Sequence, residues 1–173
     1  MRGVMMSPHE LERDYFLRRL LRELAGTLEE VVGVEEAEGY ISVVGRAMGQ
    51  WMDRLYRQEA GVERLDVAQV AEVLVDLKRR IQGGFSIESV DEMRIVLVND
   101  RCPFGELVHG RPSLCMMTSN VFGTIASANL GYAKVVLEET QARGNAGCRV
   151  VVHLCDDQAT AGVEGREYFR ELP

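Results

Sequence analysis

The hydrophobic pattern of the chain changes its period at Gly83-Gly84. Before these glycines, apolar residues recur every three or four positions, which is typical of amphipathic helices. After them come short stretches rich in β-branched residues, such as Ile95-Val96-Leu97-Val98, which indicate strands. The chain has 173 residues, a length that favours one domain with a substantial core. We therefore expect residues 1–173 to form a single α+β domain whose helical part covers residues 1–84.

Three helices are predicted in that helical part. Ser7-Pro8-His9-Glu10 is a typical helix start, and Gly33 marks the predicted end of this first helix. A second helix is expected to end at Gly61. Asp66 is the predicted N-cap of a third helix, which Gly83-Gly84 closes.

The second predicted helix contains three glycines, Gly39, Gly45 and Gly49. Each glycine in a helix costs about 1 kcal/mol relative to alanine, so we expect close packing against another backbone. Such a surface could also pack against a second copy of the chain, and a homodimer is therefore part of the prediction.

The rest of the chain alternates short strands with one helix. The expected elements are strands at 85–87 and 94–98, a helix capped by Ser113 and running to about Asn129, and strands at 133–140 and 148–154. Short turns between strands favour an antiparallel sheet of about four strands, with this helix between two hairpins and the N-terminal helices packed on the sheet. Residues 156–173 are polar, and we expect a loosely docked helix or partial disorder there.

Composition narrows the classes of function. Lys plus Arg number 20 against 27 Asp plus Glu, which gives a net charge of −7 and argues against a nucleic-acid surface. No apolar run reaches the roughly 18 residues that a membrane helix needs. The N-terminus turns acidic before an apolar signal-peptide stretch can develop. We therefore expect a soluble cytoplasmic protein that contacts neither nucleic acid directly nor a membrane.

All four cysteines lie between Cys102 and Cys155. Cys102 is predicted on a loop, Cys115 in the first turn of a helix, and Cys148 at the start of a strand. Three thiols from three elements fit a soft metal or an iron–sulfur cluster, and the helix start would stabilise a thiolate at Cys115. Cys155 lies seven positions beyond Cys148, about 23 Å along a strand, so we leave it out of this site. The plainer interpretation is that the cysteines fill the core, as free cysteines often do.

Other chemistry has weaker support. Cys115 could act as the nucleophile of a thiol enzyme, for which His109 is the evident base. The sequence contains no phosphate-binding loop, dinucleotide fingerprint, Gly-x-Ser-x-Gly or His-Glu-x-x-His pattern. A binding role is therefore favoured over an enzymatic one.

Several strings around the cysteines resemble the methanogen output domain family. The most specific are Cys102-Pro103-Phe104-Gly105 and Leu114-Cys115-Met116-Met117-Thr118-Ser119, and Gly144-Asn145-Ala146-Gly147-Cys148 follows them. The resemblance covers roughly residues 34–155. Such domains occur in signalling proteins, alone or joined to sensor and output modules. The resemblance thus implies a signalling role, with a protein signalling partner or a fused output module.

Two wider similarities concern the cysteine site. The cysteine spacing is similar to the C-terminal region of the iron–sulfur-sensing repressors of the suf operon, and this implies that Cys102, Cys115 and Cys148 hold a cluster such as 4Fe–4S. His109 is the candidate for the fourth position, alongside a carboxylate or a small molecule. The Gly144–Cys148 turn is also similar to the four-vinyl-reductase type of small-molecule-binding domain. That family's first metal-binding cysteine falls near Thr140 here, so this similarity implies a ligand cavity more than a zinc site.

Three functional hypotheses follow. The first is a sensory or regulatory domain that reports redox or cluster status through iron–sulfur ligands Cys102, Cys115 and Cys148 in signal transduction or transcription control. The second is a small-molecule sensor whose cysteines are structural or bind zinc. The third is a thiol enzyme that uses Cys115.

Overall fold

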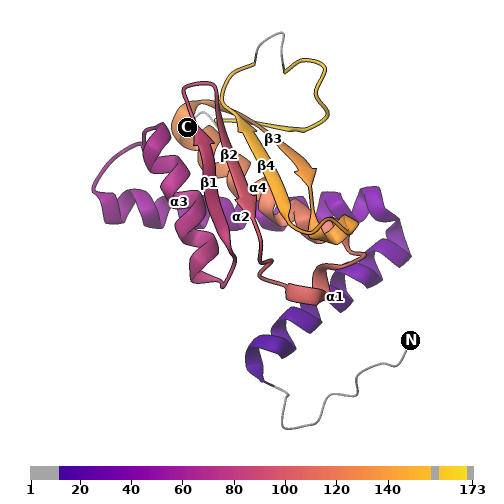
Figure 1. Cartoon of the computed structure of the whole chain (residues 1–173). Helices are drawn as coiled ribbons and strands as arrows, with labels where there is room; N and C mark the ends of the chain where they lie inside the picture. The colour runs from indigo at the N-terminus through magenta and orange to yellow at the C-terminus, as the bar shows by residue number, and fades with distance from the viewer. Residues whose placement is uncertain (1–11, 157–159, 171–173) are drawn as a thin grey trace.

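The computed structural model describes residues 12–156 and 160–170, and it confirms the α+β class (Figure 1). Its helices are α1 (Arg13–Val32), α2 (Val34–Ala60), α3 (Val67–Arg80) and α4 (Cys115–Leu130). Its strands are β1 (Phe85–Val90), β2 (Arg94–Asn99), β3 (Tyr132–Glu139), β4 (Cys148–His153) and β5 (Arg166–Phe169). Three short 3₁₀ helices lie between them: η2 (Gly105–Val108), η3 (Pro112–Leu114) and η4 (Gln141–Arg143).

The sheet has five antiparallel strands in the order β1-β2-β4-β3-β5. The four strands predicted from the sequence are all present, and β5 is the fifth. It lies in the polar stretch 156–173, where we expected a docked helix or disorder, and that expectation was wrong for β5. Backbone hydrogen bonding to β3, with Arg166 opposite Val135, forms this short edge strand. Four residues with the sequence Arg-Glu-Tyr-Phe are too few and too polar to signal a strand by alternation.

One face of the sheet packs against α3 and α4. Leu97 and Val150 on this face join Leu74 of α3 and Phe122 of α4 in the main core. Helix α4 lies between the sheet and α2 (Figure 1), and every residue from Ser119 to Ser127 is buried. A helix enclosed in this way needs small or apolar residues around its whole circumference.

Close contact between α2 and α4 explains two of the glycines in α2. A Cβ atom on Gly45 would lie 2.7 Å from the Cβ of Asn120, and one on Gly49 would lie 2.8 Å from the Cβ of Thr124. The predicted close packing is thus confirmed, and its partner is α4 of the same chain. These two glycines therefore do not supply a surface for a second copy.

Helix ends follow the expected chemistry in α2 and α3. Gly61 ends α2 in the left-handed conformation, and Asp66 forms a capping box with Gln69 at the start of α3. The predicted role of Ser113 was wrong: its hydroxyl donates to Glu29 of α1, and α4 begins two residues later, after η3. The predicted start of the first helix at Ser7 lies outside the described residues.

Within the described residues, none of the helices combines the length and the apolar character needed to cross a bilayer.

Replacing Gly49 by alanine tests the α2–α4 packing. The new methyl group meets the Thr124 side chain, so we expect Gly49→Ala to lower the free energy of unfolding by about 1–3 kcal/mol in chemical denaturation. Gly39 is the matched control, because a Cβ atom there meets nothing within 4 Å. Gly39→Ala should raise stability by about 0.5–1 kcal/mol through helix propensity alone. Equal effects of the two substitutions would contradict this packing.

Candidate functional site

A cavity of about 280 Å³ lies at the end of the sheet where β2 ends, beneath α1. The end of α3, the start of α4, the loop after β2 and the adjoining ends of β3 and β4 complete its wall. Most of the lining is apolar, and includes Leu17, Phe85, Val108, Met117, Leu137 and Val150. The cavity therefore suits a ligand with an apolar body.

Three of the four cysteines line this cavity. Cys102 comes from the loop after β2, Cys115 is the first residue of α4, and Cys148 is the first residue of β4. The structure thus brings together the three residues that the sequence singled out. Across residues 12–156 and 160–170, however, no group of three His, Cys, Asp or Glu side chains is close enough to hold a metal ion. The donor set suits a soft metal, but the spacing of the thiols does not form a ready metal site.

Two side-chain amides fix the loops that carry Cys102 and Cys148. The Asn99 oxygen accepts hydrogen bonds from the backbone N–H groups of Gly84 and Arg101, at 3.1 and 3.0 Å, while its nitrogen lies 3.8 Å from the Cys148 sulfur. Gln141 accepts from the backbone N–H of Cys102 at 3.2 Å and donates to two backbone carbonyls of the flanking loops. Rigid loops of this kind hold the thiols at the cavity wall.

A buried lysine, which the sequence analysis did not select, also lines the cavity. Lys78 is 5% exposed, and its ammonium donates to the Thr118 hydroxyl at 2.7 Å. It also lies over the rings of Phe85 and Phe122, 5.6 and 5.3 Å from their centroids. A sequence signal existed: Lys78 occupies an apolar position of α3, four residues after Leu74 and three before Ile81.

The site's electrostatics are dominated by burial. Desolvation lowers the pKa of Lys78 from its ordinary 10.5 to about 8, and the three thiols nearby oppose this shift. Desolvation likewise raises the pKa of Cys115 to about 12, helped by the neighbouring Cys148 and Cys102. The prediction that the helix start stabilises a Cys115 thiolate was therefore wrong, and a thiol nucleophile there is disfavoured. Burial also raises the pKa of Cys102, although the backbone N–H groups of Phe104 and Gly105 counteract it.

Two polar groups of the cavity have unused hydrogen-bonding capacity. An ammonium has three donors, and the described residues give Lys78 one hydrogen-bond acceptor, the Thr118 hydroxyl. Thr140 is 2% exposed, lies beside the Cys115 thiol, and its hydroxyl makes no hydrogen bond of normal geometry within the described part of the chain. Arg18, by contrast, is ion-paired with Asp14 at 2.7 Å on the α1 side. An uncompensated positive charge thus sits on the inner wall at Lys78.

The other two candidate residues lie elsewhere. His109 follows η2, has a half-exposed side chain that lies 3.1 Å from Glu106, and is not among the residues that line the cavity. Cys155 follows the far end of β4, where its sulfur lies 3.5 Å from that of Met93.

The family is settled by comparison with sequence models. The model of methanogen output domain 1 matches residues 20–153, which is most of the chain. The chain belongs to this family. The matched segment contains α2, α3, α4 and strands β1 to β4, with the three cysteines of the cavity, whereas the cavity residues Asp14, Leu17 and Arg18 of α1 precede it. A search of curated proteins found no match to this member of the family.

Two solved structures share its fold. One is the phenol-responsive sensory domain of the transcription activator PoxR with phenol, with a TM-score of 0.61 and 17% identity over 83% of this chain and 75% of that one. The other is a trafficking protein particle complex subunit 3 from Naegleria fowleri covalently bound to palmitic acid, with a TM-score of 0.56 and 14% identity over 90% of this chain and 99% of that one.

The lowered pKa of Lys78 makes stability depend on pH. Between pH 8 and 10.5 the Lys78 side chain binds more protons in the unfolded chain than in the folded chain. The free-energy cost of burying Lys78 therefore falls as the pH rises through this range. In metal-free, reduced protein we expect the free energy of unfolding of wild type, relative to Lys78→Met, to rise by about 1 kcal/mol from pH 8 to 9. The comparison with the variant cancels most of the opposing titration of the thiols. Parallel curves for the two proteins would show that the ammonium is hydrated instead.

Proposed function

We propose that this domain is a sensory module whose cavity binds a small organic acid, with Lys78 as the counter-ion of the acid group. The observation that carries the proposal is a buried ammonium, with one hydrogen-bond acceptor in the described structure, on the wall of an otherwise apolar cavity. A buried charge is costly unless it is paired, and an anionic ligand supplies the missing partner. The Thr140 hydroxyl makes no hydrogen bond of normal geometry in the described part of the chain, and in this proposal it donates to the same acid group.

The size of the cavity limits the ligand. A dry apolar cavity of about 150 Å³ binds benzene in another protein, so 280 Å³ suits a substituted aromatic acid or a medium-chain fatty acid. The two proteins of similar fold support this class, since one is described with phenol and the other with palmitic acid. What the phenol and the covalently bound palmitic acid share is an apolar body, which is the part of the ligand that the apolar lining of this cavity complements.

Helix α1 is the element through which we propose that binding is reported. Leu17 and Leu21 of α1 form part of the cavity wall, so a ligand contacts this helix directly. Polar contacts tie the helix to the loop that carries Cys102: Glu29 pairs with Arg111 at 3.3 Å, and Arg22 donates to the His109 carbonyl at 2.9 Å. A ligand that packs against Leu17 and Leu21 therefore fixes α1 relative to the sheet.

Exposed apolar residues of α1 that do not line the cavity supply the output in this scheme. Phe16 and Leu24 are each 53% exposed, and Leu20 is exposed beside them. Exposed apolar residues on the wall helix fit contact with a protein signalling partner or a fused output module. Ligand-dependent placement of α1 would then change the surface that this partner meets.

Matched pairs of probes test the role of Lys78. We expect sodium octanoate to bind the wild-type protein about tenfold or more tighter than 1-octanol in calorimetric titration, because the carboxylate gains a charge-assisted hydrogen bond. The preference should disappear in Lys78→Met. Lys134→Met is the control, since Lys134 is the chain's other lysine, is also buried, and donates to the Thr160 carbonyl away from the cavity. Equal affinity for the two probes in wild type would contradict the proposal.

A metal or iron–sulfur centre at Cys102, Cys115 and Cys148 is the second candidate. What favours it is that all three thiols line one cavity, and that the nearby Cys148 adds to the raised pKa of both Cys102 and Cys115. His109, proposed from sequence for the fourth position, would have to move to reach them, because its side chain is half exposed beside Glu106.

Anaerobic purification separates the two candidates. A centre of this kind predicts a coloured protein that contains iron and sulfide, or a colourless one that contains stoichiometric zinc, and the metal should be lost on Cys→Ser substitution of any one of the three residues. Cys155→Ser is the control thiol. Protein that stays free of metal after anaerobic reconstitution, yet binds octanoate, would rule out the metal centre and leave the organic acid as the remaining proposal.

A further inference from the structure

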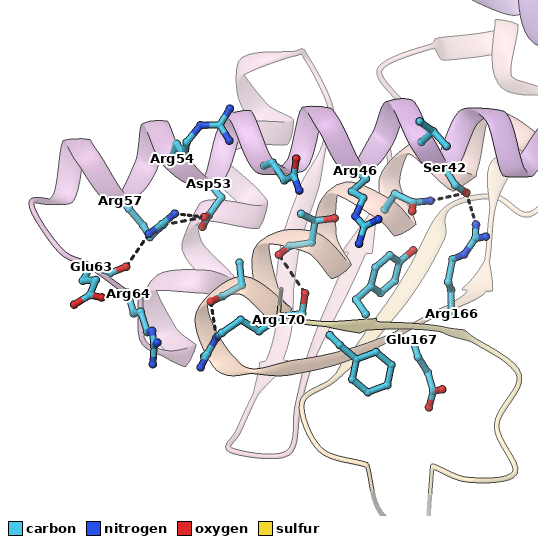
Figure 2. Close-up of a pocket in the computed structure, with 18 of the residues that line it drawn as sticks. Ser42, Arg46, Asp53, Arg54, Arg57, Glu63, Arg64, Arg166, Glu167 and Arg170 are labelled. Atoms are coloured by element: carbon cyan, nitrogen blue, oxygen red, sulfur yellow. Dashed lines mark hydrogen bonds and ion pairs between the residues drawn. The ribbon is translucent and has the colours of Figure 1, made fainter. Parts of the chain in front are cut away.

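A second hollow, distinct from the thiol cavity, is lined by a cluster of arginines. It is a groove of about 990 Å³ between α2, α4 and β5, and none of its lining residues lines the thiol cavity. Six of the chain's eighteen arginines line it: Arg46, Arg54, Arg57, Arg64, Arg166 and Arg170 (Figure 2). The chain as a whole carries a net charge of −7, so the positive charge of this groove is opposite to the net charge of the molecule.

The secondary structure places these side chains on the groove. Arg46, Arg54 and Arg57 share one side of α2 with Asp53. On β5 the alternation of side chains turns Arg166 and Tyr168 toward α2 and α4, and Arg170, directly after the strand, lies on the same side. Arg166 donates to the Ser42 hydroxyl, the Tyr168 hydroxyl lies 2.9 Å from that of Ser119, and Arg170 donates to the carbonyls of Ala128 and Asn129 at 3.0 and 2.7 Å.

Acidic side chains neutralise only part of this charge. Among residues 12–156 and 160–170, three acids line the groove: Asp53, Glu63 and Glu167. Asp53 is ion-paired with Arg57 at 2.8 Å, and the Glu167 carboxylate accepts from the Tyr132 hydroxyl at 2.8 Å. Arg54 and Arg64 make no ion pair or hydrogen bond with any described residue. Like charges gathered in a concave surface repel one another unless an anion compensates them.

The positive charge has two centres. Figure 2 shows Arg54, Arg57 and Arg64 at one end of the groove and Arg46 and Arg166 toward the other. Arg46 and Arg54 are eight residues apart on α2, which separates their Cα atoms by about 12 Å. A single phosphate or carboxylate cannot reach both ends, so the complementary ligand carries anionic groups well apart or in a chain.

We propose that this groove binds a nucleotide-class ligand with two or more phosphate groups. Arginine is the side chain best suited to phosphate, because its planar fork donates two parallel hydrogen bonds. Thr124 of α4 also lines the groove and offers a hydroxyl to a sugar. Phe169 lies on the opposite side of β5 from Arg166 and Tyr168, at the rim of the groove, where its ring meets that of Tyr132 edge to face. It is 64% exposed, so its exposed surface can meet a base that extends past the strand. The inference does not depend on the function proposed for the thiol cavity.

Titration of the full chain with ATP, adenosine and inorganic triphosphate tests the assignment. We expect ATP to bind, with an affinity that falls as salt concentration rises, and to bind more tightly than either of the other two probes. Arg54→Ala/Arg64→Ala should weaken ATP binding by roughly tenfold or more. These exposed side chains make no contact that the fold needs. The control is Arg13→Ala/Arg94→Ala, which removes the same charge outside the groove and should leave the affinity unchanged.

Each other outcome overturns the proposal. Triphosphate bound as tightly as ATP would indicate an adventitious ion only. Equal weakening by both double variants would indicate a general charge effect. Absence of ATP binding at millimolar concentration would show that the groove does not bind this ligand. Binding that the Arg54→Ala/Arg64→Ala variant retains in full would show that ATP binds elsewhere. The same titration in Lys78→Met should match wild type, which separates this site from the thiol cavity.

Discussion

The burial of α4 between the sheet and α2 is the constraint on which both candidate sites depend. Gly45 and Gly49 let α2 approach α4 so closely that no Cβ atom fits between them. On its other sides α4 meets the sheet core and the ring of Tyr168 from β5, which packs on Gly123. The N-terminal turns of α4 carry Cys115 and Thr118 to the thiol cavity, and later turns carry Asn120 and Thr124 to the arginine groove. Fixing this one helix therefore fixes a wall of each site.

The thiol cavity shows how burial can outweigh favourable local chemistry. The start of a helix favours a thiolate, yet desolvation raises the pKa of Cys115 to about 12. The same apolar surroundings lower the pKa of Lys78 to about 8 while leaving its ammonium with one described acceptor. Thiols that stay protonated cannot neutralise that ammonium. An anionic ligand can, and so the electrostatics favour the organic acid over thiolate chemistry.

Local signals in the sequence predicted most of the fold. The cap at Asp66, the stop at Gly61 and the β-branched strands are short-range features, and each formed as expected. Strand β5 was missed because it forms through pairing with β3, and a polar stretch of four residues carries no sequence signal for that pairing. The capping role predicted for Ser113 was wrong for a similar reason, since its side chain makes a long-range hydrogen bond to Glu29 instead.

The candidate sites were predicted only in part. All four cysteines lie between residues 102 and 155, and from this the sequence predicted one site formed by Cys102, Cys115 and Cys148. These three residues do line one cavity. Lys78 was not predicted as a site residue, because it begins the basic run Lys78-Arg79-Arg80 at a helix end, where cations are common, although its spacing from Leu74 placed it on the apolar face of α3. The arginine groove joins residues of α2 to residues of β5 more than a hundred positions away, and no sequence pattern links them.

Nuclear magnetic resonance of protein labelled with ¹³C-lysine reports on whether Lys78 is the counter-ion of the ligand, because the chain has two lysines and both are buried. We expect the Lys78 side-chain signal to titrate near pH 8 in ligand-free protein. Octanoate should move that titration to higher pH while leaving the Lys134 signal in place. A Lys78 signal that titrates near its ordinary 10.5, or one that saturating octanoate leaves unchanged, would contradict this role of Lys78.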